Sequence, residues 1–366
     1  MSLKKEKLKF LPFRLINRVF PKQKSIWLFG SWFGDKYSDS PRYLFEYINL
    51  EKKDIRPIWI TKDNGVYTFL KERNFEVYMF DSFLGIYYTL RASICFVTQS
   101  HIDINKYIKV PKIYNLWHGN PLKKIGNDVS KNKKKYLKDY YLSASSEIEK
   151  ENLFSAFNVF KENIFITGLP RNSAFKKKKS NIKKIIYMPT HREDSKSNVV
   201  DVISKDIEKV NAFLKSKKVE LYLRLHYYDL EKFNNLELNY TNIKKYDLDE
   251  DIYQSINNFD LLITDYSSIY LDYLLSDKPI IFFPYDLDNY ISKDREFYYD
   301  YDDVTPGPKC FDWNQIIIEV DKFINDKSYY KNDLLKTKNK FHIYQDDKYS
   351  ERVYLEAKRI LGLDNE

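Results

Sequence analysis

The sequence has few cysteines, few glycines and no long apolar run, and each shortage excludes a class of protein. Its 366 residues include two cysteines, Cys95 and Cys310, which give no metal-ligand spacing and at most one disulfide. That low number fits a reducing, intracellular location. The nine glycines form neither a G-x-G-x-x-G nor a G-x-x-x-x-G-K-[ST] motif, which argues against dinucleotide-dependent redox chemistry and P-loop hydrolysis.

Because no segment of about 18 apolar residues occurs, the sequence predicts no transmembrane helix. The N-terminus lacks the apolar run and the small-residue cleavage site of a signal peptide, so we expect a cytoplasmic protein. Hydrophobic and aromatic side chains, by contrast, make up 43% and 17% of the residues, which is enough for a buried core. The length suggests about two domains.

Lysine and arginine outnumber aspartate and glutamate by 61 to 52, a net charge of +9. This excess indicates an anionic partner, which could be nucleic acid, a phosphorylated substrate or a membrane surface. Much of it lies in residues 1–24, where eight Lys or Arg residues accompany one acid, Glu6. Leu, Phe and Ile are interleaved with these charges, as in an amphipathic segment that lies on an anionic membrane. The alternative is a helix that is solvated or packed on a domain.

Short apolar runs alternate with segments of helical periodicity along most of the chain. Such alternation is typical of βαβ units in a parallel sheet. The predicted strands are 25–30, 56–61, 76–80, 94–98, 112–117, 141–145 and 164–168, followed by 185–190, 219–226, 260–264 and 279–284.

A lysine-rich stretch, residues 176–184, interrupts this alternation and divides it into two halves. We therefore predict an α/β protein with two Rossmann-like, doubly wound domains that face a cleft. The predicted parts are a basic amphipathic N-terminal segment (1–24), an N-terminal domain (25–175), a basic linker (176–184), a C-terminal domain (185–327) and a C-terminal helical segment (328–366).

The segment Asp260–Asp286 predicts an anion site. A buried strand ends at Thr264, and Ser267 and Ser268 stand where the next helix should begin. The N–H groups at a helix start favour phosphate, and ligands of open α/β folds bind at the carboxyl ends of strands. The alternative interpretation is an ordinary helix cap.

The segment Ile113–Gly126 places His118 just after a strand, followed by Gly119 and by the pair Lys123 and Lys124. An imidazole with an ordinary pKa near 6.5 can remove a hydroxyl proton at neutral pH. The glycine permits close approach of a substrate, and the lysines attract phosphate. A structural histidine is the alternative.

Two further segments carry polar side chains at strand ends. Arg224 and His226 share one face of a predicted strand, where His226 could stabilise charge on a phosphate oxygen or lie half-buried. After the strand that ends near Thr190, Arg192 is a candidate phosphate contact, and His191 is interpreted as structural or peripheral. His101 and His342 lie outside these segments and are expected at the surface.

Several motifs together resemble the CDP-glycerol glycerophosphotransferase family, the teichoic acid and capsule primases and polymerases. They occur in that family's order between about Trp27 and Trp313, and the second half is the denser match. The motifs are SWFGDKYSDSPRYLFEYI, WHGNPLKKIG, GLPRN, MPTHRED, RLH, ITDYSSIYLDY and KPIIFFPYDLDNYISKDREFYYDYDDVTPGP. The resemblance implies a GT-B fold, with the donor nucleotide held mainly by the C-terminal domain and the acceptor entering from the N-terminal domain.

Matched residue by residue, the resemblance implies that His118 and His226 are catalytic. The implied substrate-binding residues are Gly119, Lys123, Arg171, Thr190, Arg192, Arg224, Thr264, Asp265, Ser267, Ser268 and Arg295. This sequence departs from the family's usual residues at Asn120, Ser173, His191 and Tyr227, where Thr, Asp, Trp and Pro are typical. None of these changes removes a proposed catalytic group.

The resemblance predicts transfer of glycerol phosphate from CDP-glycerol to a lipid-linked or polymer acceptor, with CMP released and no metal or cofactor required. The enzyme would act at the cytoplasmic face of the cell membrane. CDP-ribitol as donor and a GT-B glycosyltransferase that uses a sugar nucleotide are the alternatives. A nucleic-acid-binding protein is disfavoured, because the lysines are scattered and no recognised motif is present. One-unit or many-unit addition and the oligomeric state are left open by the sequence.

Overall fold

The structure is a computed structural model that describes residues 8–129, 136–176, 181–192, 199–225, 229, 233, 235, 239–247, 251–293, 296–326 and 328–364. Its contacts divide the chain into two compact units. The N-terminal unit comprises the described parts of Met1–His118, Ser130–Ser173 and Ile343–Glu366, and the C-terminal unit those of Gly119–Val129 and Ala174–His342.

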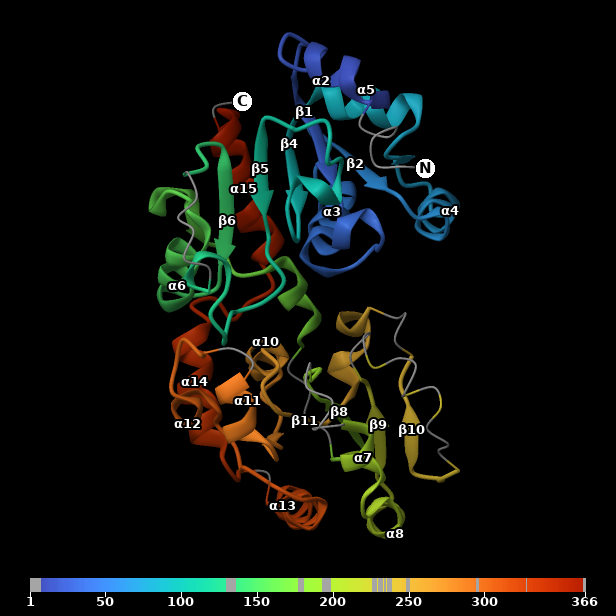
Figure 1. Ribbon diagram of the computed structural model, residues 1–366, viewed down its shortest axis with the longest axis vertical. Coiled ribbons are helices and arrows are strands. Elements are labelled where there is room, and N and C mark those ends of the chain that lie inside the picture. The colour runs from blue at the N-terminus through green and yellow to red at the C-terminus, as the bar shows by residue number, and fades with distance from the viewer. Residues whose placement is uncertain are drawn as a thin grey trace. The chain divides into compact units, whose positions relative to one another are not determined.

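The N-terminal unit is built on a parallel sheet with the strand order β3-β2-β1-β4-β5-β6-β7 (Figure 1). The order reverses direction between β1 and β4, which makes the sheet doubly wound, as predicted. All seven predicted strands are present: β1 (Gln23–Phe29), β2 (Arg56–Thr61), β3 (Val77–Met79), β4 (Ala92–Val97), β5 (Lys112–Asn115), β6 (Tyr140–Ala144) and β7 (Ile164–Ile166).

Three helices of this unit, α4, α5 and α6, begin at side chains that cap them. Asp63, Ser82 and Ser146 each accept a hydrogen bond from a backbone N–H of the first turn that follows. The core is aromatic and includes Trp27, Phe29 and Phe96 on the strands. The helices are α2 (Leu11–Ile16), α3 (Asp39–Glu51), α4 (Asn64–Glu72), α5 (Phe83–Arg91), α6 (Glu147–Phe157) and α15 (Tyr349–Leu361).

The C-terminal unit has a second parallel sheet, in the order β10-β9-β8-β11-β12. Its strands are β8 (Lys184–Met188), β9 (Glu220–Leu223), β10 (Ile243–Lys245), β11 (Leu261–Thr264) and β12 (Ile280–Phe282). Its helices are α7 (Val199–Ser204), α8 (Ile207–Lys217), α10 (Ile269–Tyr273), α11 (Leu287–Lys293), α12 (Tyr301–Val304), α13 (Trp313–Asn325) and α14 (Lys331–Phe341). The pattern of residues 249–257 also predicts a helix from the sequence, and this prediction is wrong, because 3₁₀ turns occupy Ile252–Gln254 and Ile256–Asn258.

The division into units differs from the predicted boundaries at two places. The segment Gly119–Val129 packs with the C-terminal unit, since Lys124 N–H donates to the Glu296 carbonyl at 2.8 Å and Tyr298 N–H to the Leu122 carbonyl at 2.8 Å. The C-terminal helical segment is shared, because α14 belongs to the C-terminal unit and α15 to the N-terminal one. The apolar face of α15, which includes Val353 and Ala357, completes the core around Trp27.

Among the described residues, no helix is long and apolar enough to cross a bilayer.

Candidate active site

His118 follows β5 at the carboxyl edge of the N-terminal sheet, in a turn shaped by its neighbours. The Asn115 side chain accepts a hydrogen bond from Trp117 N–H at 2.8 Å and donates to the Gln99 carbonyl at 3.0 Å. Trp117 and Gly119 have φ angles of 54° and 135°, so the backbone reverses sharply on both sides of the histidine. The positive φ at Gly119 explains the glycine at this position.

The ring of His118 is held in one orientation. Its Nδ1 lies 3.3 Å from the carbonyl oxygen of Thr98. The centroids of the Trp117 and Trp32 rings lie 3.8 and 5.6 Å from the centroid of the His118 ring. A carbonyl only accepts hydrogen bonds, so this contact assigns the proton to Nδ1 and leaves the lone pair on Nε2. Burial lowers the pKa of His118 below its ordinary value, which keeps the ring neutral at pH 7.

A buried carboxylate, Asp103, organises the loops beside His118. It accepts hydrogen bonds from the N–H groups of Phe33, Thr98 and Gln99, each at 2.8 Å, and from the Thr98 hydroxyl at 3.0 Å. Burial nevertheless raises the pKa of Asp103. These bonds join the loop after β1 to the loop after β4, and they fix the carbonyl that orients His118. The sequence reasoning missed Asp103, which nothing in its local pattern marks.

Arg171, a predicted substrate-binding residue, forms a buried ion pair with Asp39 in the same unit. Arg171 Nη1 lies 3.0 Å from Asp39 Oδ1, and the two side chains are 3% and 5% exposed. Asp39 was also missed as a candidate, although it lies in the N-terminal motif Ser31–Ile48 that carries part of the resemblance. Arg171 therefore already has a partner within the protein. Asp39 becomes a candidate residue because its charge raises the pKa of His118.

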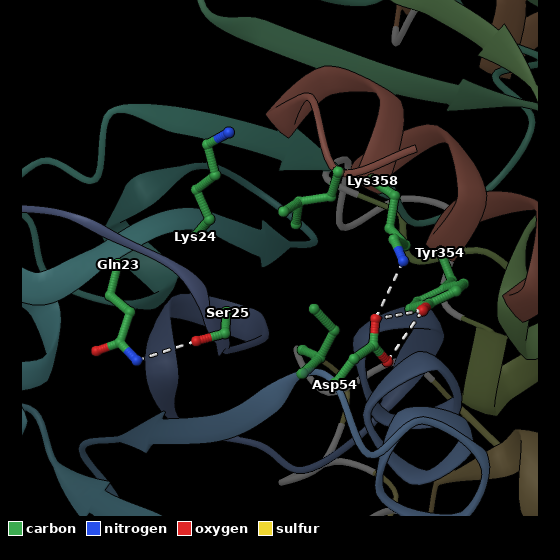
Figure 2. A pocket seen from close by; sticks show the side chains of 8 residues that line it. Gln23, Lys24, Ser25, Asp54, Tyr354 and Lys358 are labelled. Carbon is green, nitrogen blue, oxygen red and sulfur yellow. Dashed lines mark hydrogen bonds and ion pairs between the residues drawn. The ribbon is translucent and has the colours of Figure 1, made fainter. Parts of the chain in front are cut away.

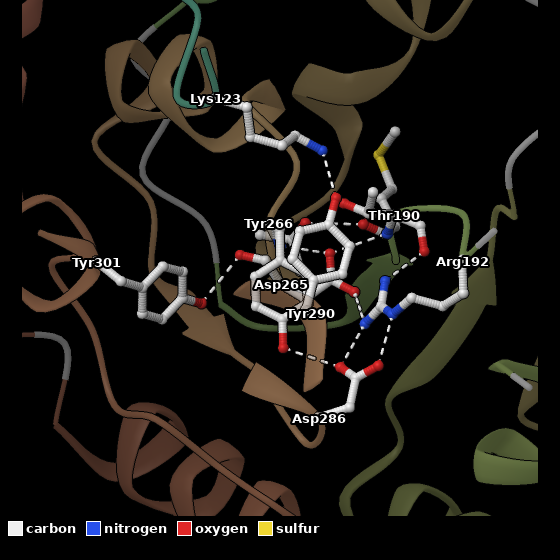
Figure 3. A network of polar contacts seen from close by, with 10 residues as sticks. Lys123, Thr190, Arg192, Asp265, Tyr266, Asp286, Tyr290 and Tyr301 are labelled. Atoms are coloured by element: carbon white, nitrogen blue, oxygen red, sulfur yellow. Dashed lines mark hydrogen bonds and ion pairs between the residues drawn. The ribbon is translucent and has the colours of Figure 1, made fainter. Parts of the chain in front are cut away.

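In the C-terminal unit, Asp265 and Arg192 lie at the centre of a polar network (Figure 3). Asp265 follows β11 and accepts hydrogen bonds from Thr190 N–H at 2.8 Å and from Tyr266 N–H. Arg192 contacts Asp265 at 2.8 Å and binds both carboxylate oxygens of Asp286, at 2.8 and 2.9 Å. Burial opposes the charge on Arg192, but Asp265 and Asp286 raise the pKa of Arg192 above its ordinary value. Arg192 thus ties together the loops that follow β8, β11 and β12.

Aromatic hydroxyls extend this network toward Lys123. The rings of Tyr266 and Tyr290 stack with centroids 4.0 Å apart, and the Tyr266 hydroxyl donates to Asp286 at 2.8 Å. Lys123 donates to the Tyr290 hydroxyl at 2.6 Å, as Figure 3 shows. The predicted lysine therefore joins the network from the segment that follows His118.

The predicted phosphate loop is a short turn. The Thr264 hydroxyl donates to the Met188 carbonyl at 2.7 Å, so it links β11 to β8. Ser268 precedes α10 but its hydroxyl caps no backbone N–H, while the Ser267 hydroxyl accepts weakly from Ile269 N–H at 3.5 Å. The hydroxyls of both serines are therefore little used by the helix itself.

The remaining predicted residues make contacts other than those of this network or are not among the residues that the structure describes. Arg224 donates to the Asp247 carbonyl at 2.7 Å, and His191 Nδ1 lies 3.0 Å from Asp229, in keeping with its peripheral interpretation. His226 and Arg295 lie outside the described residues. The surface placement of His342 is wrong: it is 1% exposed and its Nε2 lies 2.7 Å from the Leu271 carbonyl. His101 is half-buried.

No cluster of three or more His, Cys, Asp or Glu side chains that could hold a metal occurs in the part of the chain that the structure describes. A cavity of about 570 Å³ does occur in the N-terminal unit, at the edge of the sheet where β1 and β2 begin (Figure 2). There Asp54 accepts hydrogen bonds from the Tyr354 hydroxyl at 2.8 Å and from Lys358 at 3.2 Å. His118 follows the other end of the strands, so this cavity is not its site.

Comparison with known proteins gives consistent results. A family model described as CDP-glycerol:poly(glycerophosphate) glycerophosphotransferase matches residues 12–357. A teichoic acid poly(glycerol phosphate) polymerase of Bacillus spizizenii is 30% identical over 363 residues, 86% of this chain and 87% of that protein. A teichoic acid glycerol-phosphate transferase of Staphylococcus aureus is 28% identical, over 82% of this chain and 83% of its own.

Among solved structures, the wall teichoic acid polymerase TagF superposes with a TM-score of 0.80 at 23% identity, over 100% of this chain and 96% of that chain. At this level of identity, the likeness shows a shared fold.

Proposed function

Because the chain belongs to the CDP-glycerol:poly(glycerophosphate) glycerophosphotransferase family, we propose that it transfers glycerol phosphate from CDP-glycerol to a hydroxyl group of a lipid-linked or polymer acceptor. Family membership makes the chain a transferase and confirms the resemblance on which that activity was predicted. The predicted GT-B-like fold is confirmed as well. Relatives named for teichoic acid synthesis support the same setting for this enzyme.

His118 is the proposed general base, and the observation that carries this role is its contact with the Thr98 carbonyl. With the proton on Nδ1, Nε2 can accept the proton of the acceptor hydroxyl. The hydroxyl oxygen then attacks the phosphorus nearer to glycerol, and the bond from that phosphorus to the CMP oxygen breaks. A phosphodiester forms and CMP leaves with the bonding electron pair.

The C-terminal unit is the proposed donor-binding unit. In the loop after β11, the hydroxyls of Ser267 and Ser268, which the helix itself uses little, supply hydrogen-bond donors for the pyrophosphate, and Lys123 supplies a cation. Arg192 and Asp265 shape this loop by binding each other, which argues for a supporting role rather than the phosphate contact expected of Arg192. The roles of His226 and Arg295 as charge-stabilising and binding residues are supported by their motifs alone, and those of Gly119, Thr190 and Arg224 by motif and position.

The enzyme is proposed to act as a peripheral protein on an anionic membrane surface at the cytoplasmic side. Phe10, which precedes α2, is buried against Ile86 and Leu90 of α5, and the two helices lie at the same end of the N-terminal unit in Figure 1. Leu15 on α2 and Val19 just after the helix are apolar and 68% and 80% exposed. Arg14 and Arg18, adjacent to these side chains in the sequence, suit anionic headgroups.

Liposome co-sedimentation of a Leu15→Glu, Val19→Glu variant tests the membrane proposal. Leu50→Glu is the control, because Leu50 is 73% exposed and belongs to a different helix, α3. We expect vesicles with anionic lipids to pellet the control but not the double variant. Equal pelleting of both would contradict this surface as the membrane contact.

The reaction is tested by incubating the enzyme with CDP-glycerol or CDP-ribitol and a lipid-linked acceptor analogue, followed by mass spectrometry. We expect CMP and an acceptor enlarged by one or more glycerol phosphate units, the number of which separates a primase from a polymerase. Products that form from CDP-ribitol alone would contradict the proposed donor.

A further inference from the structure

The Asp39–Arg171 ion pair joins two segments that are distant in sequence. Asp39 begins α3, whereas Arg171 lies in the 3₁₀ turn Pro170–Ala174 after β7. Burying two opposite charges costs desolvation energy that offsets most of their attraction, so stability alone is a weak reason for such a pair. A role in function explains the burial of this ion pair better than stability does.

The local geometry of Asp39 fixes its carboxylate. Its φ angle is 64°, which is uncommon for a residue other than glycine. Its Oδ1 accepts a hydrogen bond from Ser40 N–H at 2.7 Å in addition to the contact with Arg171. Backbone strain that surrounding contacts maintain is often found at functional sites.

The loop that leads to Asp39 packs on His118. It connects β1 to α3, and within it Trp32 lies against the histidine ring and donates its N–H to the Thr98 hydroxyl at 2.9 Å. The same Thr98 supplies the carbonyl that holds His118 Nδ1. The charge of Asp39 raises the pKa of His118 and that of Arg171 lowers it, so both side chains lie within electrostatic reach of the ring.

We infer that Asp39 is a positioning residue that supplies the counter-charge for the imidazolium formed when His118 accepts the acceptor's proton, and that Arg171 holds Asp39 in place and limits its effect. This inference rests on the proposed role of His118 as the general base. Before reaction the pair has no net charge and the histidine is neutral. During reaction a positive charge appears on the ring, and the nearby carboxylate stabilises it.

The two charges act on His118 with opposite signs. Burial lowers the pKa of His118, Asp39 raises it and Arg171 lowers it further. Removing the carboxylate with Asp39→Asn should therefore move the acidic limb of the pH–rate profile to lower pH and reduce the plateau rate. Arg171→Gln should move the limb to higher pH. We expect shifts of about 1 pH unit in each direction.

The experiment measures kcat for CMP release against pH in the full-length enzyme for both single variants and the Asp39→Asn, Arg171→Gln double variant. The double variant contains no unpaired buried charge, and its limb should return close to that of the wild type. If Asp39→Asn does not fold, comparing Arg171→Gln with the double variant still isolates the effect of Asp39. Glu46→Gln on the same helix is the control, because Glu46 pairs with Arg42 and should leave the limb in place.

Limbs that move in the same direction, or that do not move, would overturn the inference, since a purely structural pair has no reason to shift them oppositely. The His118→Asn variant distinguishes a wrong role for Asp39 from a wrong role for His118 as the general base. If that variant turns over normally, the general-base proposal is wrong. If it is inactive and the limbs stay fixed, only the role of Asp39 is wrong.

Discussion

Replacing Arg192 with methionine tests whether this side chain supports the donor loop or binds the donor directly. The substitution keeps much of the apolar volume but removes every hydrogen bond of the guanidinium. The carboxylates of Asp265 and Asp286, whose side chains are 0% and 9% exposed, then lose their cation. If Arg192 is a structural support, the main consequence is a loss of stability.

The magnitude follows from the contacts that survive. Breaking a buried ion pair by removing one partner costs about 3–5 kcal/mol. Asp265 keeps its bonds from the N–H groups of Thr190 and Tyr266, and Asp286 keeps the Tyr266 hydroxyl, so we expect a loss of about 3 kcal/mol, at the lower end. For a unit of this size, that corresponds to a melting temperature lower by about 6–12 °C.

The assay is thermal unfolding followed by circular dichroism, with CDP-glycerol binding measured by calorimetry well below the transition. Arg42→Met is the matched control, because its partly exposed pair with Glu46 should contribute less than about 1 kcal/mol. An unchanged melting temperature combined with lost CDP-glycerol binding would refute the reasoning, and it would make Arg192 a direct phosphate contact.

Three further outcomes are expected. Gly168→Ala should destabilise the N-terminal unit by about 1–3 kcal/mol in urea unfolding, because φ is +67° there and a Cβ would lie 2.4 Å from the Tyr349 ring; an unchanged midpoint would contradict this. Thr264→Val should cost about 1 kcal/mol by loss of the bond to the Met188 carbonyl, and a stabilised variant would contradict that role. Because burial lowers the pKa of His118, the unfolded chain takes up this proton first, so stability should fall as pH decreases below about 6.5. His118→Asn should flatten that decrease, which unfolding at pH 5 and 7 would measure.

Strands such as β2 and β4 of the N-terminal unit were predictable because each is a short, largely apolar run that is almost entirely buried. In β4 every residue is buried and all but Ser93 are apolar, which produces a strong apolar signal. β10 was not predicted, since its three residues, Ile243–Lys245, include two lysines and only the isoleucine is buried. Helices α14 and α15 follow each other in the sequence but belong to different units. Both have helical periodicity, and periodicity does not show which sheet a helix covers.

At the site, the position of His118 after a strand and beside a glycine was predictable, but the contacts that define its chemistry were not. The Thr98 carbonyl, Asp39 and Asp103 come from other segments of the chain, and only the fold brings them together. For Arg192 the position was predictable but the role was not. A charged residue after a strand suggested contact with a ligand, but in the structure its guanidinium pairs with the carboxylates of Asp265 and Asp286, which lie in two other loops.

The central claim is that His118, oriented by the Thr98 carbonyl, takes the acceptor's proton during glycerol phosphate transfer. Its most direct test is the single-turnover rate of CMP release by His118→Asn, measured with a saturating lipid-linked acceptor and with CDP-glycerol binding determined on the same sample. The account predicts donor binding close to that of the wild type and a rate lower by at least about 100-fold. A rate within a few-fold of the wild type, with the donor bound, would contradict it.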